Sequence, residues 1–336
     1  MLILLNLLVM LLVILLASEI FCNALEHLGT KLKISEGVTG SLFAAVGTAL
    51  PETMVPILAI FAGTNNVSVN QEIGVGAILG APLMLSTLSL SLLMVFTFKS
   101  RGINGHFTPE KTGITRDLNF FLLAFLLAAI AMVIPAEFSA IRTAIAFTLV
   151  LVYFIYIMLT LRASAQLVEA GHGTDAHGIM YLCRLGLPQN LLTILVQLGV
   201  GLALLVAGAK GFIYGVEQAA PLLGISALLL SLLIIPIATE LPEKVNSVLW
   251  IRKGKDTLAF GNITGAMVFQ GTLLPAIGVM LTPWEFRYDV LLGILITLVA
   301  ALWMRLLLLR GQLRVWHLAI NGALYAGYLV TVLTVR

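Results

Sequence analysis

Long apolar stretches separated by short polar breaks run along the whole chain. A helix needs roughly 20 mostly apolar residues to cross the hydrocarbon core of a bilayer, and the breaks divide the sequence into about ten such stretches. They lie near residues 1–22, 36–62, 70–98, 118–135, 138–162, 189–216, 221–250, 257–281, 287–308 and 314–335. The pattern predicts an all-α membrane protein with about ten transmembrane helices.

Composition supports this interpretation and excludes several classes of function. With 60% hydrophobic and 10% charged residues among 336, the chain cannot cover a soluble globule with polar side chains. The short polar segments leave no room for an ATPase module or a nucleic-acid surface, and no phosphate-binding glycine loop is present. We therefore expect the lipid bilayer as a partner, no nucleic acid and no cofactor.

Basic residues concentrate in alternate loops. Those that follow the first, third, fifth, seventh and ninth stretches are Lys31, Lys33, Lys99, Arg101, Lys111, Arg116, Arg162, Arg184, Arg252, Lys253, Lys255, Arg305, Arg310 and Arg314. The other loops and the C-terminus carry only Arg142, Arg287 and Arg336. By the positive-inside rule the basic loops are cytoplasmic. Both termini then lie on the outer side of the membrane in which the protein is expected, the cell (inner) membrane.

The N-terminal stretch and the cysteines need no special role. Residues 1–17 lack the basic start and the cleavage site of a signal peptide, so we interpret them as part of the first span. Cys22 and Cys183 are too isolated for a disulfide framework or a metal site, and we interpret them as free thiols.

The tripeptide Leu-Pro-Glu occurs twice at membrane depth, at residues 50–52 and 241–243. Proline inside a helix frees backbone carbonyls, and a glutamate in the bilayer is costly unless it binds a cation or a proton. Hard cations such as calcium favour carboxylate and carbonyl oxygens. The two copies predict an ion site with Glu52 and Glu243 as metal ligands. The alternative is that the prolines are structural kinks and the glutamates face the helix bundle.

The two copies belong to a longer repeat. Shifting the sequence by 191 residues also aligns Glu26 with Glu217, and a shift of 185 places residues 76–81 over 261–266. If each half holds five of the about ten spans, the halves enter the membrane from opposite sides and form an inverted-topology repeat. The predicted divisions are a first repeat at 1–162 with its motif at 47–85, a cytoplasmic linker at 163–188, and a second repeat at 189–336 with its motif at 236–271.

Two of the spans are predicted to be interrupted. The stretch at 36–62 carries Gly47, Pro51 and Pro56, and the stretch at 221–250 carries Pro236 and Pro242. Interruptions at membrane depth are tolerated where protein or a water-filled cavity satisfies the freed backbone groups. The stretches that follow carry small residues that allow close helix packing: Gly74, Gly76, Gly80, Ala81, Gly261, Gly265, Ala266 and Gly271.

These motifs resemble those of the cation/calcium exchanger superfamily, whose two repeats read Gly-Thr-Ser-Leu-Pro-Glu followed by Gly-Asn-x-x-Gly-Ser-Asn. The second repeat matches closely at 238–243 and 261–266, and the first matches at 47–52 and less well at 76–82. The resemblance covers nearly the whole chain. It implies exchange of a cation by alternating access, with Glu52 and Glu243 as central ligands and the backbones of Thr48 and Thr239 contributing carbonyls.

Several neutral oxygen ligands of the family pattern are missing. Small hydroxyl or amide positions of the family hold Ala49, Ala77, Ala81, Pro82, Leu85, Glu240 and Ala266 here, and Gln270 stands where a carboxamide or carboxylate is expected. Sodium coordination at several sites is therefore disfavoured. Carboxylates clustered away from water bind protons readily, because desolvation and like charge both oppose ionisation, so proton coupling is favoured over sodium coupling.

Glu240 and Lys244 have the spacing of an ion pair on one helix face. One interpretation is structural, in which two costly charges neutralise each other. The other is functional, with the Lys244 ammonium as an internal cation that leaves when calcium enters. We group Glu240, Lys244 and Gln270 as residues that tune the charge or carry the counter-ion.

The sequence bears on three classes of function. The sequence favours a secondary antiporter that exchanges calcium or a similar divalent cation for protons or sodium. The alternative is a cation channel or a transport-inactive membrane scaffold that keeps the exchanger fold. An enzyme is not expected, since His-Glu-x-x-His, paired Asp and Gly-x-Ser-x-Gly motifs are missing. His172, Asp175 and His177 form a polar segment that is either a solvated loop or a metal- or pH-sensing cluster.

Overall fold

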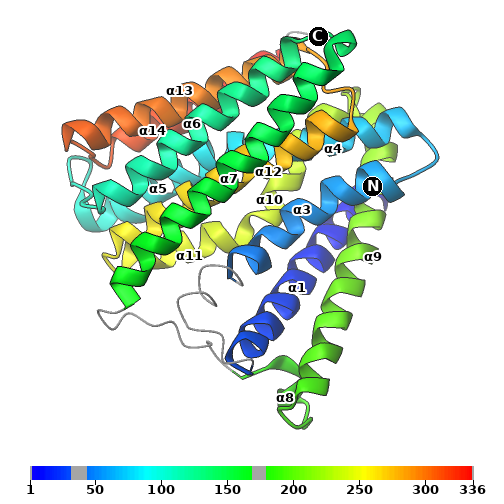
Figure 1. The fold of residues 1–336 in the computed structure, drawn as a ribbon, viewed down its shortest axis with the longest axis horizontal. Helices are drawn as coiled ribbons and strands as arrows, with labels where there is room; N and C mark the ends of the chain where they lie inside the picture. Colours follow the sequence, from blue (N-terminus) through cyan, green and yellow to red (C-terminus); the bar gives the residue numbers. More distant parts are fainter. Residues whose placement is uncertain (1, 32–43, 169–178, 335–336) are drawn as a thin grey trace. The chain divides into compact units, whose positions relative to one another are not determined.

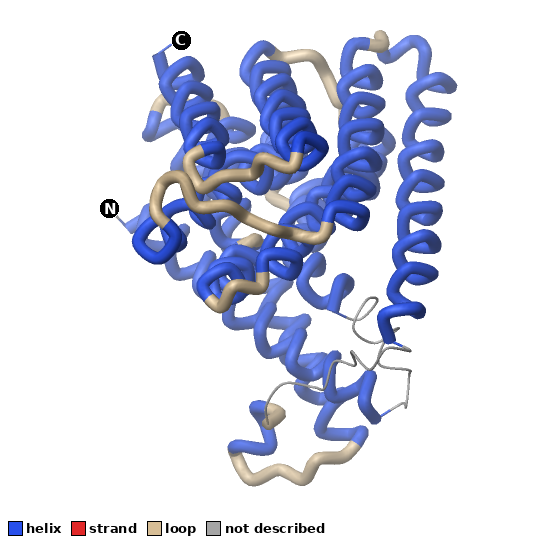
Figure 2. Tube along the Cα trace, turned by 90° about the vertical axis from the view of Figure 1, so that its left-hand side faces the viewer, coloured by secondary structure: helices blue, strands red, loops and turns tan. Residues whose placement is uncertain are grey.

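The computed structural model describes residues 2–31, 44–168 and 179–334. Within these ranges the regular elements are helices joined by loops (Figure 2), which confirms the all-α prediction. Eight helical segments of this part are long and apolar enough to cross a membrane. The chain is therefore an integral membrane protein.

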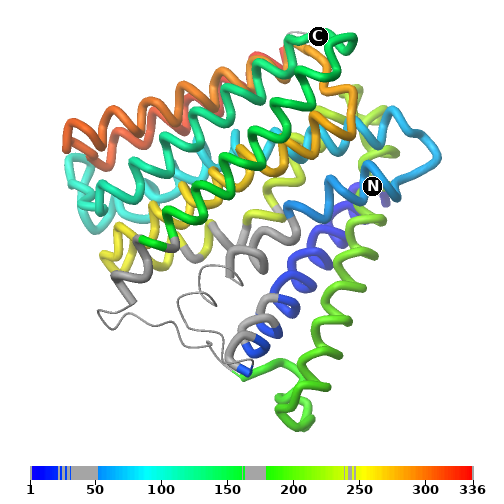
Figure 3. The backbone as a smooth tube through the Cα atoms, viewed as in Figure 1, coloured from blue at the N-terminus to red at the C-terminus, as the bar shows by residue number. Residues whose placement is uncertain are grey.

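The helices can be followed in chain order in Figures 1 and 3. They are α1 (Leu2–Lys31), α3 (Ala44–Ala62), α4 (Val67–Met84), the π-helical turn η2 (Leu85–Ser89), α5 (Leu90–Arg101), α6 (Lys111–Val133), the 3-10 turn η3 (Ala136–Phe138), α7 (Ser139–Val168), α8 (Tyr181–Arg184), α9 (Leu191–Leu223), α10 (Ala227–Thr239), α11 (Leu241–Arg252), α12 (Asp256–Leu281), α13 (Tyr288–Arg310) and α14 (His317–Thr334).

The eight candidate spans correspond to eight of the stretches expected from hydropathy. The other two stretches, 36–62 and 221–250, contain the shorter apolar helices Glu52–Ala62 and Ala227–Ile237. Residues 36–43 lie outside the described part. The count of about ten spans and their inverted repeat stay predictions.

The chain forms two compact units, each built from two separate segments. Unit 1 comprises Met1–Ile73 and Ile157–Leu230, and unit 2 comprises Gly74–Tyr156 and Ser231–Arg336. Each unit therefore takes one segment from each half of the sequence. The predicted repeats, which end at residue 162 and begin again at residue 189, are defined by sequence similarity and not by these units. Their boundaries stay predictions.

In unit 1, α1 packs along α9, and α3 packs against both (Figure 1). Glycines on α9 make the close approach to α1 possible. A Cβ added to Gly201 would lie 3.0 Å from the Phe21 backbone, and one on Gly211 would lie 2.4 Å from the Met10 sulfur. Because membrane helices associate through such backbone contact, these glycines determine the pairing of α1 with α9.

Unit 2 is organised around α12, which packs against α6, α11 and η2. A Cβ on Gly271 of α12 would lie 2.6 Å from the Phe121 ring of α6, so this glycine is needed for the packing. Phe121 stacks in turn on Phe125, with the ring centroids 5.2 Å apart. In η2 the Ser86 carbonyl accepts a hydrogen bond of 2.8 Å from the Asn321 amide of α14.

Local sequence signals explain where several of these helices begin and end. α9 begins after Asn190, whose side chain accepts from the Thr193 amide, and α6 begins after Glu110, whose carboxylate accepts from the Thr112 and Gly113 amides. α9 ends at Gly224, which has a φ of 64° that a residue with a Cβ rarely adopts.

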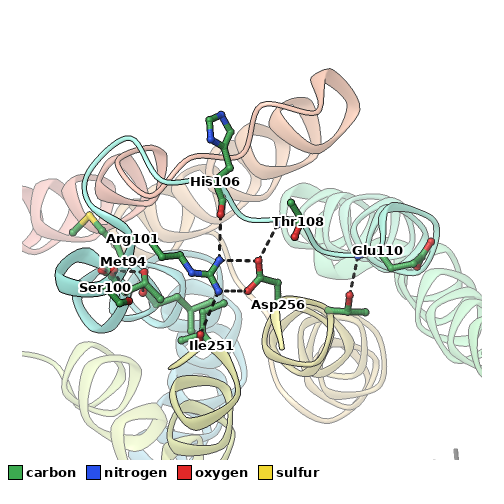
Figure 4. A network of polar contacts seen from close by, with 11 residues as sticks. Met94, Ser100, Arg101, His106, Thr108, Glu110, Ile251 and Asp256 are labelled. Carbon is green, nitrogen blue, oxygen red and sulfur yellow. Dashed lines mark hydrogen bonds and ion pairs between the residues drawn. The ribbon is translucent and has the colours of Figure 1, made fainter. Parts of the chain in front are cut away.

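Three basic loops of unit 2 meet at one end of that unit. Arg101 at the end of α5 donates to both carboxylate oxygens of Asp256 at the start of α12, at 2.6 and 2.8 Å (Figure 4). Asp256 also accepts from the Thr108 amide at 2.8 Å, and the Phe107 amide donates to the Leu313 carbonyl at 2.9 Å. The alternation of basic loops requires the ends of the third, seventh and ninth stretches to share a side, and unit 2 has this arrangement.

Candidate cation site

The second Leu-Pro-Glu lies at a break between two helices. α10 ends at Thr239, α11 begins at Leu241, and Glu240 between them has a φ of −94° and a ψ of 8°. Pro242 fits at the start of α11, because the amide hydrogen that it lacks has no helical partner there. The predicted interruption of this stretch is confirmed.

Pro236 loosens α10 one turn before the break. Proline has no amide hydrogen to donate to the carbonyl four residues earlier, which here belongs to Leu232. Gly80 of α4 faces this carbonyl so closely that an added Cβ would lie 2.1 Å from the oxygen. The small residue predicted to serve helix packing at position 80 therefore brings α4 against the interrupted helix.

Glu240 and Lys244 form the ion pair that their spacing predicts. The Lys244 Nζ lies 3.5 Å from the Glu240 Oε2, and the two side chains are 7% and 0% exposed. The ammonium also donates to the Pro236 carbonyl at 2.9 Å and to the Met84 sulfur at 2.8 Å. Since unpaired buried charges are costly, each member of the pair holds the other in place.

The glycine-rich part of the second motif is tied to neighbouring helices by side-chain hydrogen bonds. Asn262 of α12 donates to the Ser247 hydroxyl of α11 at 3.0 Å. Thr264 donates at 2.8 Å to the carboxylate of Asp117 on α6, which also accepts from the Tyr156 hydroxyl at 3.2 Å. These bonds fix the rotation of α12 relative to α11, α6 and α7.

Sequence reasoning missed Asp117 as part of this arrangement. The predicted span began at residue 118, whereas α6 begins at Lys111 and buries Asp117 within the helix. A lone Asp next to Arg116 carries no motif, so only its contact with Thr264 reveals it.

Two further predicted residues of the second repeat are buried in unit 2. Thr239 is 2% exposed, and its hydroxyl donates to the Ile235 carbonyl at 3.2 Å, while cation binding by its backbone carbonyl stays a prediction. Gln270 is also 2% exposed, and within the described part of the chain its Oε1 has no hydrogen-bond partner. Such a buried acceptor is a suitable ligand for a cation.

The first Leu-Pro-Glu has a different local structure. α3 is a single helix from Ala44 to Ala62, so the interruption expected at Gly47 and Pro51 was wrong for this part of the chain. At the 191-residue offset, Pro236 corresponds to position 236 − 191 = 45, which is Ala45. The first copy therefore lacks the proline that precedes the break in the second copy.

The predicted cation ligands are divided between the units. Glu52 lies on α3 in unit 1 and is 4% exposed, while Glu243 lies on α11 in unit 2. The side chains of Glu243 and Thr48 lie outside the described part of the structure. In the described part, no group of three His, Cys, Asp or Glu side chains could hold a metal ion. The meeting of Glu52 and Glu243 at one ion stays a prediction.

The polar segment with His172, Asp175 and His177 also lies outside the described residues. Cys183 has a free thiol, and the side chain of Cys22 is not described. The interpretation of Cys183 is thus confirmed.

A family model described as sodium/calcium exchanger protein matches residues 2–162 and 193–334. The chain belongs to this family. The match covers both segments of each unit and both Leu-Pro-Glu motifs, which confirms the resemblance stated from the motifs.

Individual relatives agree with this assignment. The putative antiporter CaxA of Alkalimonas amylolytica is 28% identical over 269 residues, which cover 80% of this chain and 77% of CaxA. The crystal structure of the H+/Ca2+ exchanger CAX has a TM-score of 0.70 at 20% identity, covering 98% of this chain and 82% of CAX. A structure of the sodium-calcium exchanger NCX_Mj has a TM-score of 0.59 at 18% identity, covering 100% of this chain and 99% of NCX_Mj. The two structures establish the exchanger fold.

Proposed function

We propose that this protein is a secondary antiporter that exchanges calcium or a similar divalent cation for protons or sodium by alternating access. The observation that carries the proposal is the break at Glu240, where a buried carboxylate and loosened backbone occur together in a membrane helix. An exchanger needs such an oxygen-rich, irregular segment at membrane depth, because it must replace the water shell of its ion.

Glu52 and Glu243 bind the divalent ion in this proposal, and the backbones of Thr48 and Thr239 add carbonyl oxygens. The two carboxylates come from the two sequence repeats, as expected for a site at the repeat interface. Protons are the favoured counter-ion, since Ala81 and Ala266 replace neutral oxygen ligands that sodium would require. The protein works in the cell (inner) membrane with both termini outside.

Transport by the purified protein in liposomes tests this proposal. We expect calcium uptake driven by a pH gradient, and the same vesicles will rank magnesium and manganese as substrates. Glu52→Gln and Glu243→Gln, which keep the side-chain volume and remove the charge, should each abolish uptake. Glu137→Gln is the matched control, because Glu137 lies exposed in η3. Parental uptake by both site variants would refute the assignment.

The same assay separates the alternatives. A channel gives a flux that follows voltage and needs no counter-ion. A scaffold gives neither flux nor calcium binding. Sodium coupling replaces proton coupling if uptake follows a sodium gradient at constant pH.

A further inference from the structure

The Lys244 ammonium is bound by the kinds of group that bind metal cations. Its Nζ is 2.9 Å from a backbone carbonyl of the interrupted helix, that of Pro236, and 3.5 Å from the Glu240 carboxylate. Carbonyl and carboxylate oxygens are the ligands that hard cations prefer. A third contact, to the Met84 sulfur at 2.8 Å, brings α4 to the same point.

This ammonium is an internal charge. A lysine near a membrane surface extends its amine into water, but Lys244 is only 7% exposed, and its amine is directed back along the chain to Pro236, eight residues earlier. A buried ammonium is tolerated where the site supplies a compensating negative charge, and Glu240 supplies it.

The pair also replaces a neutral group. Where the family motif has a hydroxyl, this chain has Glu240, and one helical turn later it has Lys244. The first repeat holds Ala49 and Thr53 at the corresponding positions, 240 − 191 and 244 − 191, so the charge pair is confined to the second repeat.

We propose that the Lys244 ammonium is a tethered monovalent cation that fills a cation position of the second repeat. Glu240 supplies the negative charge of that position and Pro236 its carbonyl. Because the cation is attached to the chain, exchange proceeds without a free monovalent ion there, and sodium is excluded from the position. The inference rests on the proposed transport function for its role in exchange, but the binding of a cation at this position can be tested separately.

The test uses thermal unfolding of purified protein in detergent, in sodium chloride and in choline chloride of equal ionic strength. Lys244→Ala vacates the position and leaves the Glu240 charge. We expect sodium to raise the unfolding midpoint of this variant, beyond any shift in the parent, by about 2–4 °C at a concentration ten times the dissociation constant. In liposomes, Lys244→Ala should lose most calcium uptake in choline and recover it in sodium.

Two variants control this result. Glu240→Gln/Lys244→Ala removes both charges, and its midpoint should show no additional sodium shift. Lys244→Gln retains most of the volume and can still donate to the Pro236 carbonyl, so it should fold even if Lys244→Ala does not, with a smaller sodium shift.

The outcomes decide between a tethered cation and a structural ion pair. If the single variants that fold show no sodium shift beyond that of the parent, or if the double variant shows the same shift, the proposal is wrong. The unfolding midpoint can be measured whether or not the protein transports calcium. A parent protein without calcium flux would therefore refute the proposed function, while the sodium shift of the variants would still test the tethered cation.

Discussion

In unit 1 the Leu-Pro-Glu at residues 50–52 lies inside α3, a continuous helix, whereas in unit 2 the copy at residues 241–243 opens α11 after a break. The tripeptide is the same in both copies, so it does not determine the break. The second copy differs by Pro236, which has Ala45 as its counterpart, and by the charged residues Glu240 and Lys244. The neighbours of the motif determine its backbone.

The difference also concerns charge. In unit 2 a fixed ammonium lies against the loosened backbone, bound to the Pro236 carbonyl and paired with Glu240. At the corresponding positions the first copy carries Ala49 and Thr53, neither of which is ionised. The second copy thus holds a carboxylate and an ammonium at two positions where the first copy holds neither charge.

The strongest test of this asymmetry is removal of one member of the pair. Glu240→Ala removes the carboxylate that lies 3.5 Å from the buried Lys244 ammonium, and we expect a loss of about 3–5 kcal/mol in the free energy of unfolding. Glu240→Met/Lys244→Met removes both charges and should cost far less. Denaturant unfolding in detergent measures both variants. Equal stability of Glu240→Ala and the parent would show that the pair does not hold the break.

The contact of α4 with the loosened carbonyl is tested at Gly80. Gly80→Ala places a Cβ against the Leu232 carbonyl, which belongs to the backbone and cannot rotate away, so we expect a loss of about 1–3 kcal/mol. Gly327→Ala in α14 is the matched control, because nothing lies within 4 Å of its added Cβ. It should be neutral or stabilising by up to about 1 kcal/mol. Thermal unfolding that ranks the two variants in the opposite order would contradict the packing at Gly80.

The far ends of the two motif helices are anchored by different chemistry. After α3, the Asn70 Oδ1 accepts from the Thr64 amide and its Nδ2 donates to the Thr64 carbonyl at 2.7 Å. After α11, Asp256 pairs with Arg101. Asn70→Ala and Asp256→Asn should each lower the free energy of unfolding by about 1–3 kcal/mol. Only the cost of Asp256→Asn should shrink in 1 M salt, because Arg101 is partly exposed. Equal salt dependence would contradict the ionic assignment.

The smallest effect concerns Glu110, which caps α6. Burial acts to raise the pKa of Glu110, but hydrogen bonds from Gly113 and Thr112 and the charge of Arg116 outweigh it, so the pKa lies below its ordinary value. A lowered pKa in the folded state stabilises the protein above the unfolded-state pKa, and this gain is lost as pH falls through the folded-state pKa. Glu110→Gln should lower the free energy of unfolding by about 1 kcal/mol at neutral pH. The unfolding midpoints of variant and parent should converge as the pH falls through the lowered folded-state pKa of Glu110. A constant difference across pH would contradict an ionic cap.

Much of the fold follows from the sequence because bilayer-length apolar stretches have few alternatives. The stretch at 257–281 is α12, at 256–281, and the stretch at 287–308 differs from α13, at 288–310, by one residue at its start and two at its end. Helix α3 shows the limit. A proline pattern alone did not distinguish a tolerated proline from a break, because the break also depends on the residues around it.

The candidate site was predictable where chemistry repeats and unpredictable where a single contact decides. The spacing of Glu240 and Lys244 predicts their pairing, and the structure confirms it. Met84 carries no signal as a partner of an ammonium, since a methionine in an apolar stretch is normally assigned to packing. Asp117 meets Thr264 only because α6 packs on α12, which local sequence does not specify.

The π-helical turn at Leu85–Ser89 means that α4 and α5 form one rod with two rotational phases. Gly80 and Met84 belong to the first phase, and the ion-paired Arg101 belongs to the second. The turn holds about one residue more than ordinary α-helical winding would place there, so deleting one residue from it would restore that winding with little rotation of the two parts, whereas the same deletion within α4 or α5 would rotate one part of the rod against the other by about 100°. In this protein a single-codon deletion would therefore have little torsional effect inside the turn, but elsewhere between Gly80 and Arg101 it would misalign either the contacts of Lys244 or the Arg101 anchor while leaving the hydropathy profile almost unchanged.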